Sequence, residues 1–331
     1  MVQIGSVNTN TNIFMASMAG CSDLAFRLIA REHGAQFCFH EMSDSNSLVY
    51  GTGGKNADMH QAHPLDTPVA AQLVGADPEI MLKAAKIILA INPNIAFLDI
   101  NAACPVRKII KKKAGAFLLK EPEGLYRIID KLASNLSLPI TVKLRTGYQA
   151  RDIEMIVLIA QKCEQSGASA LFVHGRTKVQ EYAGEVDHET IRAIKANVKI
   201  PVMASGNIFS GEKAKEMFDL TGCDGVMVAR GACGHPWIFG QIKEYLTNGV
   251  VVPDPTLKER LAVAVKHLQY IEKYKILSER TKVGFSRKVA IWYLKHFRNA
   301  GVLRRAVGRA QSFQEFYQLI DELAASPISS S

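Results

Sequence analysis

Two residues capable of chemistry, Asn101 and Cys104, follow the apolar stretch FLDI at residues 97–100. The apolar residues predict a strand, and Pro105 predicts its end. A strand that presents an amide and a thiol at its carboxyl end is typical of barrel and doubly wound enzymes. A lone cysteine is nevertheless more often a buried small residue than a reactive one. The rest of the chain must therefore decide whether Cys104 is chemical or structural.

Polar side chains also follow the other predicted strands. Lys143 is the most informative, because an ammonium group on an inner strand is costly unless an anion faces it. No Asp or Glu is expected at the same level on the neighbouring strand ends, so a bound anionic cofactor or substrate would supply the partner. The other candidates are Ser17, Met18 and Ala19, then Gln72, Arg145, His174, Arg176, Ser205, Gly206, Asn207, Ala229 and Arg230.

Small residues precede the helices predicted after the last two strands, at 205–207 (SGN) and 229–231 (ARG). Small side chains let backbone N–H groups approach a phosphate, and a helix N-terminus adds a favourable dipole. Arg230 adds a fixed positive charge. In a TIM barrel the loops after the seventh and eighth strands form the usual phosphate site. The pattern predicts a phosphate group without identifying the molecule that carries it.

Eight short apolar stretches alternate with helix-like stretches over about 245 residues. Continuous apolar strands indicate burial on both faces, which is typical of a parallel sheet. Eight strand–helix units of this length favour an α/β fold, a TIM (β/α)8 barrel. A doubly wound sheet is disfavoured because no early Gly-x-Gly-x-x-Gly turn is present. The strands are expected at 12–18, 36–41, 68–74, 96–101, 139–145, 168–174, 201–204 and 225–229.

The sequence changes character at residue 250. Residues 250–255 hold two prolines and predict a linker, and helices are expected at 257–275, 281–300 and 313–323. We therefore expect a barrel domain over residues 1–249 and a small helical domain over residues 250–331. Residues 255–331 hold 14 Lys and Arg against 6 Asp and Glu, whereas residues 1–254 hold 26 against 25. This asymmetry favours an acidic partner, a nucleic acid or an anionic membrane, over a merely solvated basic face.

The composition argues against several other classes of protein. No apolar run approaches the roughly 18 residues that span a bilayer, and no secretory signal is apparent at the N-terminus. The six cysteines are scattered without CxxC or metal-ligand spacing, so we expect free thiols and no metal site. These features predict a cytoplasmic protein without membrane contact, and we expect a monomer.

Several short motifs follow one another along residues 11–323: MASMAGCSD at 15–23, Gln72, DINAACP at 99–105, VKLRTG at 142–147, VHGRT at 173–177, SGNI at 205–208, ARG at 229–231 and HPWIF at 235–239. In this order they resemble the motifs of the tRNA-dihydrouridine synthases. RKVAIWYL at 287–294 is similar to the bacterial B-type branch. Three positions depart from the family pattern. Ser17 stands where the family usually has proline, and Ala103 and Ala229 stand where it usually has glycine.

This resemblance implies a barrel that holds FMN, a basic helical domain that binds tRNA, and NADPH as the reductant. It implies hydride transfer from reduced FMN to C6 of a uracil in the tRNA D-loop, with Cys104 donating a proton to C5. A thiol near its reference pKa of about 8.5 is mostly protonated at pH 7, which suits this role. The implied FMN ligands are Ser17, Met18, Ala19, Gln72, Lys143, His174, Ser205, Gly206, Asn207, Ala229 and Arg230. Substrate binding is implied for Asn101, Arg176, Arg287 and Lys288.

Two other functions remain open from the sequence. A flavin barrel that acts on a free pyrimidine or another small molecule would explain the strand ends, but not the basic C-terminal region. An RNA-binding module with an inactive barrel would explain the charge, but not the combination of Lys143 and Cys104.

Overall fold

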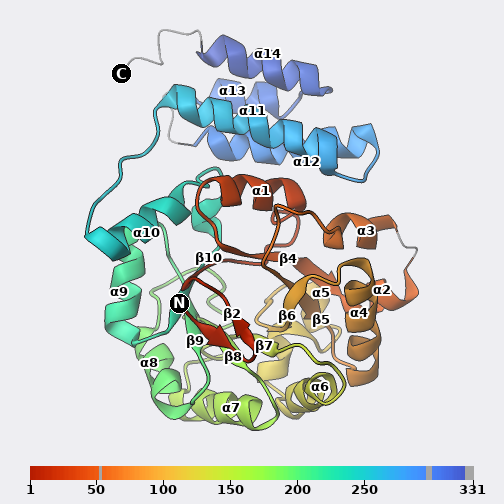
Figure 1. Cartoon of the computed structure of the whole chain (residues 1–331), viewed down its shortest axis with the longest axis vertical. Helices are drawn as coiled ribbons and strands as arrows, with labels where there is room; N and C mark the ends of the chain where they lie inside the picture. The colour runs from red at the N-terminus through yellow and green to blue at the C-terminus, as the bar shows by residue number, and fades with distance from the viewer. Residues whose placement is uncertain (52–53, 296–299, 325–331) are drawn as a thin grey trace.

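The computed structural model describes residues 1–51, 54–295 and 300–324, and its parallel strands close into an eight-stranded barrel (Figure 1). The strand order follows the chain, and β10 pairs with β3 to close the barrel. The strands are β3 (Ile13–Met15), β4 (Phe37–Asp44), β5 (Val69–Val74), β6 (Ile95–Ala102), β7 (Ile140–Arg145), β8 (Ala170–His174), β9 (Val202–Ser205) and β10 (Gly225–Val228). The predicted TIM barrel is confirmed.

Aromatic side chains fill the inside of the barrel. The rings of Phe37 and Phe97 stack at 5.0 Å between centroids, and Phe14 and Phe39 each contact Phe172 edge to face. Met203 and Met227 belong to the same buried cluster. The interior is therefore a packed core rather than a pore. Polar side chains can face a cavity only where the strands emerge from it.

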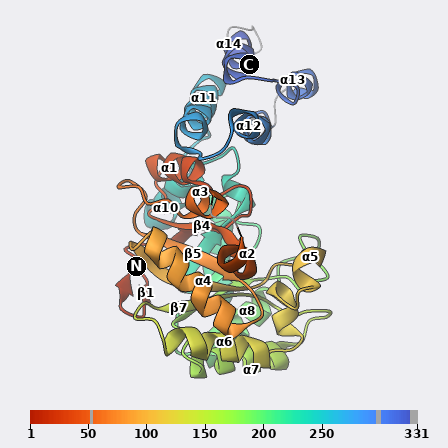
Figure 2. The ribbon, with the colours of Figure 1, turned by 90° about the vertical axis from the view of Figure 1, so that its right-hand side faces the viewer.

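A short hairpin closes the amino end of the barrel, formed by β1 (Gln3–Ile4) and β2 (Val7–Asn8). Val2 and Ile4 are buried in the same cluster as the interior phenylalanines. The sequence did not predict this hairpin, because two-residue strands are too short to show a period. Figure 2 shows the hairpin at the left end of the barrel and α5 (Arg107–Ile110) at the right end. The carboxyl ends of the barrel strands, and the polar residues that follow them, therefore lie at the right end in this view.

Helices surround the barrel, and aspartate or serine side chains cap several of them, such as Asp77 at α4 and Ser210 at α9. These helices are α1 (Leu24–Glu32), α4 (Pro78–Ile91), α6 (Glu123–Ala133), α7 (Ile153–Gln165), α8 (His188–Asn197), α9 (Gly211–Thr221) and α10 (Ile238–Asn248). The long polar segment 43–66, predicted as a loop with a short helix, holds two helices, α2 (Ser45–Tyr50) and α3 (Gly54–His60).

The C-terminal region forms a helical layer above α1 (Figure 1), with a buried core that includes Leu268, Val289 and Phe316. It consists of α11 (Leu257–Tyr274), α12 (Glu279–Tyr293), α13 (Ala300–Val307) and α14 (Phe313–Ala324). The second predicted helix, 281–300, ends at residue 293, and the rest of that prediction falls partly on residues 296–299, outside the described residues. The sequence did not predict α13. Among the described helices, none combines the length and hydrophobicity needed to cross a bilayer.

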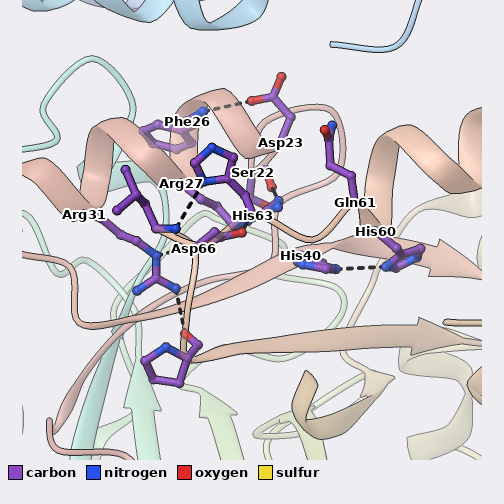
Figure 3. Close-up of polar contacts among 12 residues, drawn as sticks. Ser22, Asp23, Phe26, Arg27, Arg31, His40, His60, Gln61, His63 and Asp66 are labelled. Carbon is purple, nitrogen blue, oxygen red and sulfur yellow. Dashed lines mark hydrogen bonds and ion pairs between the residues drawn. The ribbon is translucent and has the colours of Figure 1, made fainter. Parts of the chain in front are cut away.

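Helix α1 joins these two parts of the molecule. Arg27 and Arg31 both pair with the buried Asp66, at 2.8 and 2.9 Å, which fixes α1 to the barrel wall (Figure 3). On its other side, Phe26 stacks on His267 of α11. The helical layer therefore rests on an element that the barrel already holds rigidly.

Candidate active site

A cavity of roughly 590 Å³ opens at the carboxyl ends of the barrel strands, where α12 meets the barrel. It is of the size that ligand sites usually have. Nearly all of the residues predicted for the site line it: Ser17, Met18, Ala19, Gln72, Asn101, Cys104, Lys143, His174, Ser205, Gly206, Asn207, Ala229, Arg230 and Lys288. Arg176 and Arg287 are not among the lining residues.

Asn101 fixes the loop that carries Cys104. Its Oδ1 accepts the backbone N–H groups of Ala103 and Cys104, at 3.0 and 2.8 Å. Because Oδ1 faces two donors, Nδ2 must point the other way, where it donates to Oε1 of Gln72 at 2.7 Å. Backbone geometry therefore settles the orientation of the amide. The Cys104 loop is attached to strand β5 through one side chain.

The same chain of hydrogen bonds ends at a buried carboxylate. Nε2 of Gln72 donates to Asp99 at 2.6 Å, and the Thr141 hydroxyl donates to the other carboxylate oxygen at 2.6 Å. Burial raises the pKa of Asp99 to about 6, against the opposing effect of these two donors and of Lys143. Asp99 thus remains an acceptor at neutral pH. Each atom of the Gln72 amide keeps one further hydrogen-bonding valence for a bound ring.

The Cys104 thiol is partly buried at the rim of this network. Burial raises its pKa, and a hydrogen bond from the Val106 N–H and the charge of Arg145 oppose that rise only in part. The thiol therefore holds its proton throughout the neutral range. A protonated thiol that faces a cavity can act as an acid rather than as a nucleophile.

Arg145 holds the other side of the Cys104 loop. Its Nε donates to the carbonyl of Ala103 at 2.7 Å, and its Nη1 donates to the carbonyls of Thr177 and Glu181, both at 2.9 Å. The side chain is almost completely buried. The sequence showed an arginine at this strand end but not its role. Its position within an apolar strand was the available signal.

Positive charge gathers in the cavity around His174. Burial, followed by the charges of Lys143, Arg145, Arg176 and Arg230, lowers the pKa of His174 to about 2, so the imidazole is neutral. Lys143 lies 3.3 Å from the Ser205 hydroxyl. Burial, followed by the charge of Arg145, lowers its pKa to about 7. A ligand anion would reverse this shift.

The expectation that no Asp or Glu lies at the level of Lys143 on the neighbouring strands is confirmed, because Asn101 of β6 and Phe172 of β8 pair with Lys143. Asp99 lies two residues before Asn101, opposite Thr141, and still raises the Lys143 pKa electrostatically. No carboxylate within the described residues is in ion-pair contact with Lys143. The hydrogen bonds of Asp99 go to Gln72 and Thr141 instead. Space for an anion beside Lys143 therefore remains.

The loops after β9 and β10 have the backbone that close contact with a ligand requires. Gly206 has φ +139° and Asn207 has φ +52°. A Cβ on Gly231 would clash with the carbonyl oxygen of Ile208, so only glycine fits there. Ala229 has φ −116° and ψ −100°; its φ lies outside the left-handed region that favours glycine, but its ψ lies outside the usual α and β regions.

The other two departures from the family pattern are Ser17 and Ala103. The hydroxyl of Ser17 is buried and has no hydrogen-bond partner within the described residues, although Ser17 lines the cavity. A buried hydroxyl without a partner is costly, which points to a ligand acceptor. Ala103 has both backbone groups paired, to Asn101 and Arg145, so alanine is compatible with the loop.

Three predicted substrate residues bond to protein groups. Arg176 donates to the carbonyls of Ala183 and Gly184 and so holds the loop after β8. Arg287 donates to the carbonyl of Ala310, which joins α12 to the turn before α14. Lys288 donates to the carbonyl of Gly20 at the cavity edge. Their roles in substrate binding stay predictions.

Sequence reasoning missed several residues that line the cavity, among them Tyr182, Phe209, Trp292 and Lys295. The ring of Tyr182 lies 4.5 Å from the guanidinium carbon of Arg230 and 6.0 Å from that of Arg145. Tyr182 therefore packs against both cations. It lies in a loop without periodicity, so the sequence offered no signal for it. Within the described residues, no three His, Cys, Asp or Glu side chains gather as metal ligands do.

The family model and the similar sequences agree on one family. A family model described as dihydrouridine synthase matches residues 14–328. tRNA-dihydrouridine synthase B of Pasteurella multocida is 35% identical over 306 residues, 92% of this chain and 90% of that protein. The protein of the same name from Shewanella oneidensis is 36% identical over 321 residues, 97% of each. The solved old yellow enzyme from Trypanosoma cruzi has a TM-score of 0.56 at 10% identity, covering 81% of this chain and 96% of that one, which shows the fold alone.

Proposed function

Because the chain belongs to the dihydrouridine synthase family, we propose that it reduces the C5–C6 double bond of a uridine in tRNA. The observation that supports this most directly is the Cys104 thiol. Burial keeps this thiol protonated at the mouth of a positively charged cavity, and Asn101 and Arg145 hold the backbone of its loop in place. The proposed substrate is inferred from the family and the names of the relatives. The proposed chemistry is inferred from the residues that line the cavity.

The residues present fit FMN. An anion beside Lys143, an acceptor for the Ser17 hydroxyl and a phosphate at 205–207 and 229–231 would satisfy features that the protein leaves open. Met18, Ala19, Gln72, His174 and Arg230 complete the proposed binding site. When bound and reduced by NADPH, FMN supplies the hydride that C6 of the uracil accepts.

Cys104 supplies the proton that C5 of the uracil requires. Asn101 holds the backbone of the Cys104 loop, and Arg145 ties that loop to the one that carries Tyr182. The thiol is therefore held in one position relative to the bound uracil ring, and such fixed positioning is what makes an enzyme's general acid effective. Asn101, Arg176, Arg287 and Lys288 remain the proposed tRNA contacts. Extruding the base costs a few kcal/mol, which phosphate contacts must offset.

The two parts of the chain divide this work. We assign catalysis to residues 1–249 and tRNA binding to the basic residues 250–331, with the D-loop as the site of reduction. The B-type names of the relatives and the motif at 287–294 support the assignment to that branch. We propose that the protein acts as a monomer in the cytoplasm and requires no metal.

The function is tested with the purified protein and tRNA from a strain that lacks dihydrouridine. The protein should show a flavin absorbance band, and NADPH oxidation should rise with tRNA and not with free uridine. Mass spectrometry should locate one reduced uridine. Oxidation stimulated equally by free uridine would favour the small-molecule enzyme, and a colourless protein that binds tRNA would favour the inactive barrel.

We expect the affinity of the apoprotein for FMN to fall as pH rises through about 7. The Lys143 pKa, lowered to about 7 by burial and Arg145, makes the free site lose its cation there, whereas a bound anion keeps the proton in place. The dissociation constant should therefore rise by up to about tenfold per pH unit above 7. Quenching of FMN fluorescence between pH 7 and 9 measures it.

Lys143→Arg is the matched control for this pH dependence, because arginine stays charged over the whole range. Its FMN affinity should be level between pH 7 and 9, whatever its absolute value. The FMN phosphate is already ionised above pH 7 and adds no slope of its own. Parallel curves for the two proteins would show that a different group titrates.

A further inference from the structure

A basic segment follows the Cys104 loop in sequence and in space. Residues 107–113 hold five cations in seven positions, namely Arg107, Lys108, Lys111, Lys112 and Lys113. Outside this segment, residues 1–254 hold 21 Lys and Arg against 25 Asp and Glu. Apart from this segment, residues 1–254 therefore carry a net negative charge, whereas the segment itself is strongly basic. The nearly balanced total charge of residues 1–254 does not reveal this local cluster of cations.

The segment is fixed to the Cys104 loop. The N–H of Ala116 donates to the carbonyl of Cys104 at 3.0 Å, which closes the chain from 104 to 116 into a loop. Gly115 adopts φ +63°, and a Cβ there would lie 2.8 Å from the same carbonyl oxygen. Ile109 is buried against Val74 and Ala114. One side of the loop is thus anchored, and its cations face solvent.

All five cations are exposed. Lys112 pairs with Asp44 at 2.7 Å. The other four have no hydrogen-bond or ion-pair partner for their side chains within the part of the chain that the structure describes. Five like charges so close together repel one another, and a single carboxylate compensates only one of them. An external anion of extended shape would compensate the others.

The position of the segment indicates which anion this is. Val106, directly before it, lines the active-site cavity, and Lys288 and Lys295 line the same cavity from the helical region. Figure 2 shows α5 at the right-hand end of the barrel, below α12 and α13. Cations therefore stand on two sides of the cavity mouth. When a base is extruded into such a cavity, its backbone leaves the mouth in two directions.

We propose that residues 107–113 form a second tRNA contact, which binds the phosphate backbone on the side of the cavity opposite the helical region. This inference rests on the proposed function. The contact is assigned to phosphates rather than to bases, because four of the five cations are lysines, and a lysine ammonium acts as a point charge on a flexible stem. It would hold the target nucleotide from both sides while Cys104 faces the ring.

The test uses Lys108→Gln with Lys111→Gln in the full-length holoenzyme, leaving the Lys112–Asp44 pair intact. Binding of tRNA without dihydrouridine is measured from about 50 to 300 mM salt. We expect affinity to fall on the order of tenfold at about 150 mM salt, and the log–log salt slope to shrink by about 0.7–0.9 for each phosphate that the variant no longer binds. The KM for tRNA should rise, whereas the KM for NADPH stays unchanged.

Lys83→Gln with Lys86→Gln is the matched control, because both lysines are exposed on α4 and the change in net charge is the same. It should leave the slope and the KM for tRNA near wild type. Equal effects of the two double variants, or a rise in the KM for NADPH alone, would overturn the inference. Wild-type protein that reduces no uridine in tRNA would overturn the proposed function instead, which the same experiment reveals separately.

Discussion

Cys104→Ala is expected to lower dihydrouridine formation by about 10²–10⁴-fold, while FMN and tRNA still bind. A positioned general acid contributes a factor of this size, and the fold change corresponds to about 3–5 kcal/mol in the activation barrier. The packing cost is small, because the thiol lies partly exposed at the cavity and not in the core. Single-turnover formation of dihydrouridine in tRNA measures the effect.

Two readouts separate the loss of the acid from damage to the site. Bleaching of the flavin by NADPH without tRNA should proceed at the wild-type rate, because Cys104 donates to the uracil and not to the cofactor. Cys21→Ala is the matched control, since Cys21 lines the same cavity but lies outside the loop held by Asn101. Turnover of Cys104→Ala within tenfold of wild type would assign the proton to another group.

The thiol also predicts the pH profile of the wild-type reaction. Burial raises the Cys104 pKa, so the acid form persists through the neutral range and disappears only above the ordinary thiol pKa of about 8.5. The rate of the tRNA step should thus be level between about pH 6.5 and 8 and then fall at alkaline pH. A rate that rises steadily to pH 9 would indicate a thiolate instead.

The sequence predicted those parts of the site that depend on strand ends. Eight apolar runs identify a closed parallel barrel, and a barrel brings Cys104, Lys143 and Arg230 together even though they are far apart in the chain. Physical rules about where parallel strands end are enough for that step. The identity of the ligands came from the resemblance to a family.

The parts that the sequence did not predict depend on register and on loops. Asp99 reads as one more residue of an apolar strand, and only the pairing of β5, β6 and β7 places it between Gln72 and Thr141. Tyr182 contacts Arg230 because Arg145 and Arg176 fold its loop by bonds to backbone carbonyls. Such bonds do not depend on the residue type of the acceptor, so no sequence pattern marks them.

The second large effect is expected at Lys275, where the helical region meets the barrel. Its Nζ lies 3.0 Å from Asp23 and 3.2 Å from Asp58, and all three side chains are nearly inaccessible to solvent. Burial lowers the Lys275 pKa, but the two carboxylates raise it by more, so the group is charged. Figure 3 shows Asp23 at the start of α1, pointing away from the barrel strands. One cation thus neutralises two buried acids from different elements.

Lys275→Met should destabilise the protein by about 3–5 kcal/mol, because it leaves two carboxylates buried without a cation. Urea unfolding measures this loss. Asp58→Asn in the same chain should recover part of it, because one uncompensated charge is then removed, and a double-mutant cycle gives the coupling. A loss below about 1 kcal/mol would show that the pair behaves like one at the surface.

The functional consequence of Lys275→Met follows from the position of the pair. The turn that carries Lys275 also binds the barrel through the Ile276 N–H, which donates to Asp58 at 2.7 Å, and through the Tyr274 carbonyl, which accepts from Gln61. Weakening this contact should let the helical region shift while the cavity stays intact. We therefore expect kcat/KM for tRNA to fall about tenfold or more, whereas bleaching of the flavin by NADPH stays unchanged. We also expect the variant to reduce uridines at more than one position of the tRNA. Uniform loss of both half-reactions would instead mean that the barrel itself had been damaged.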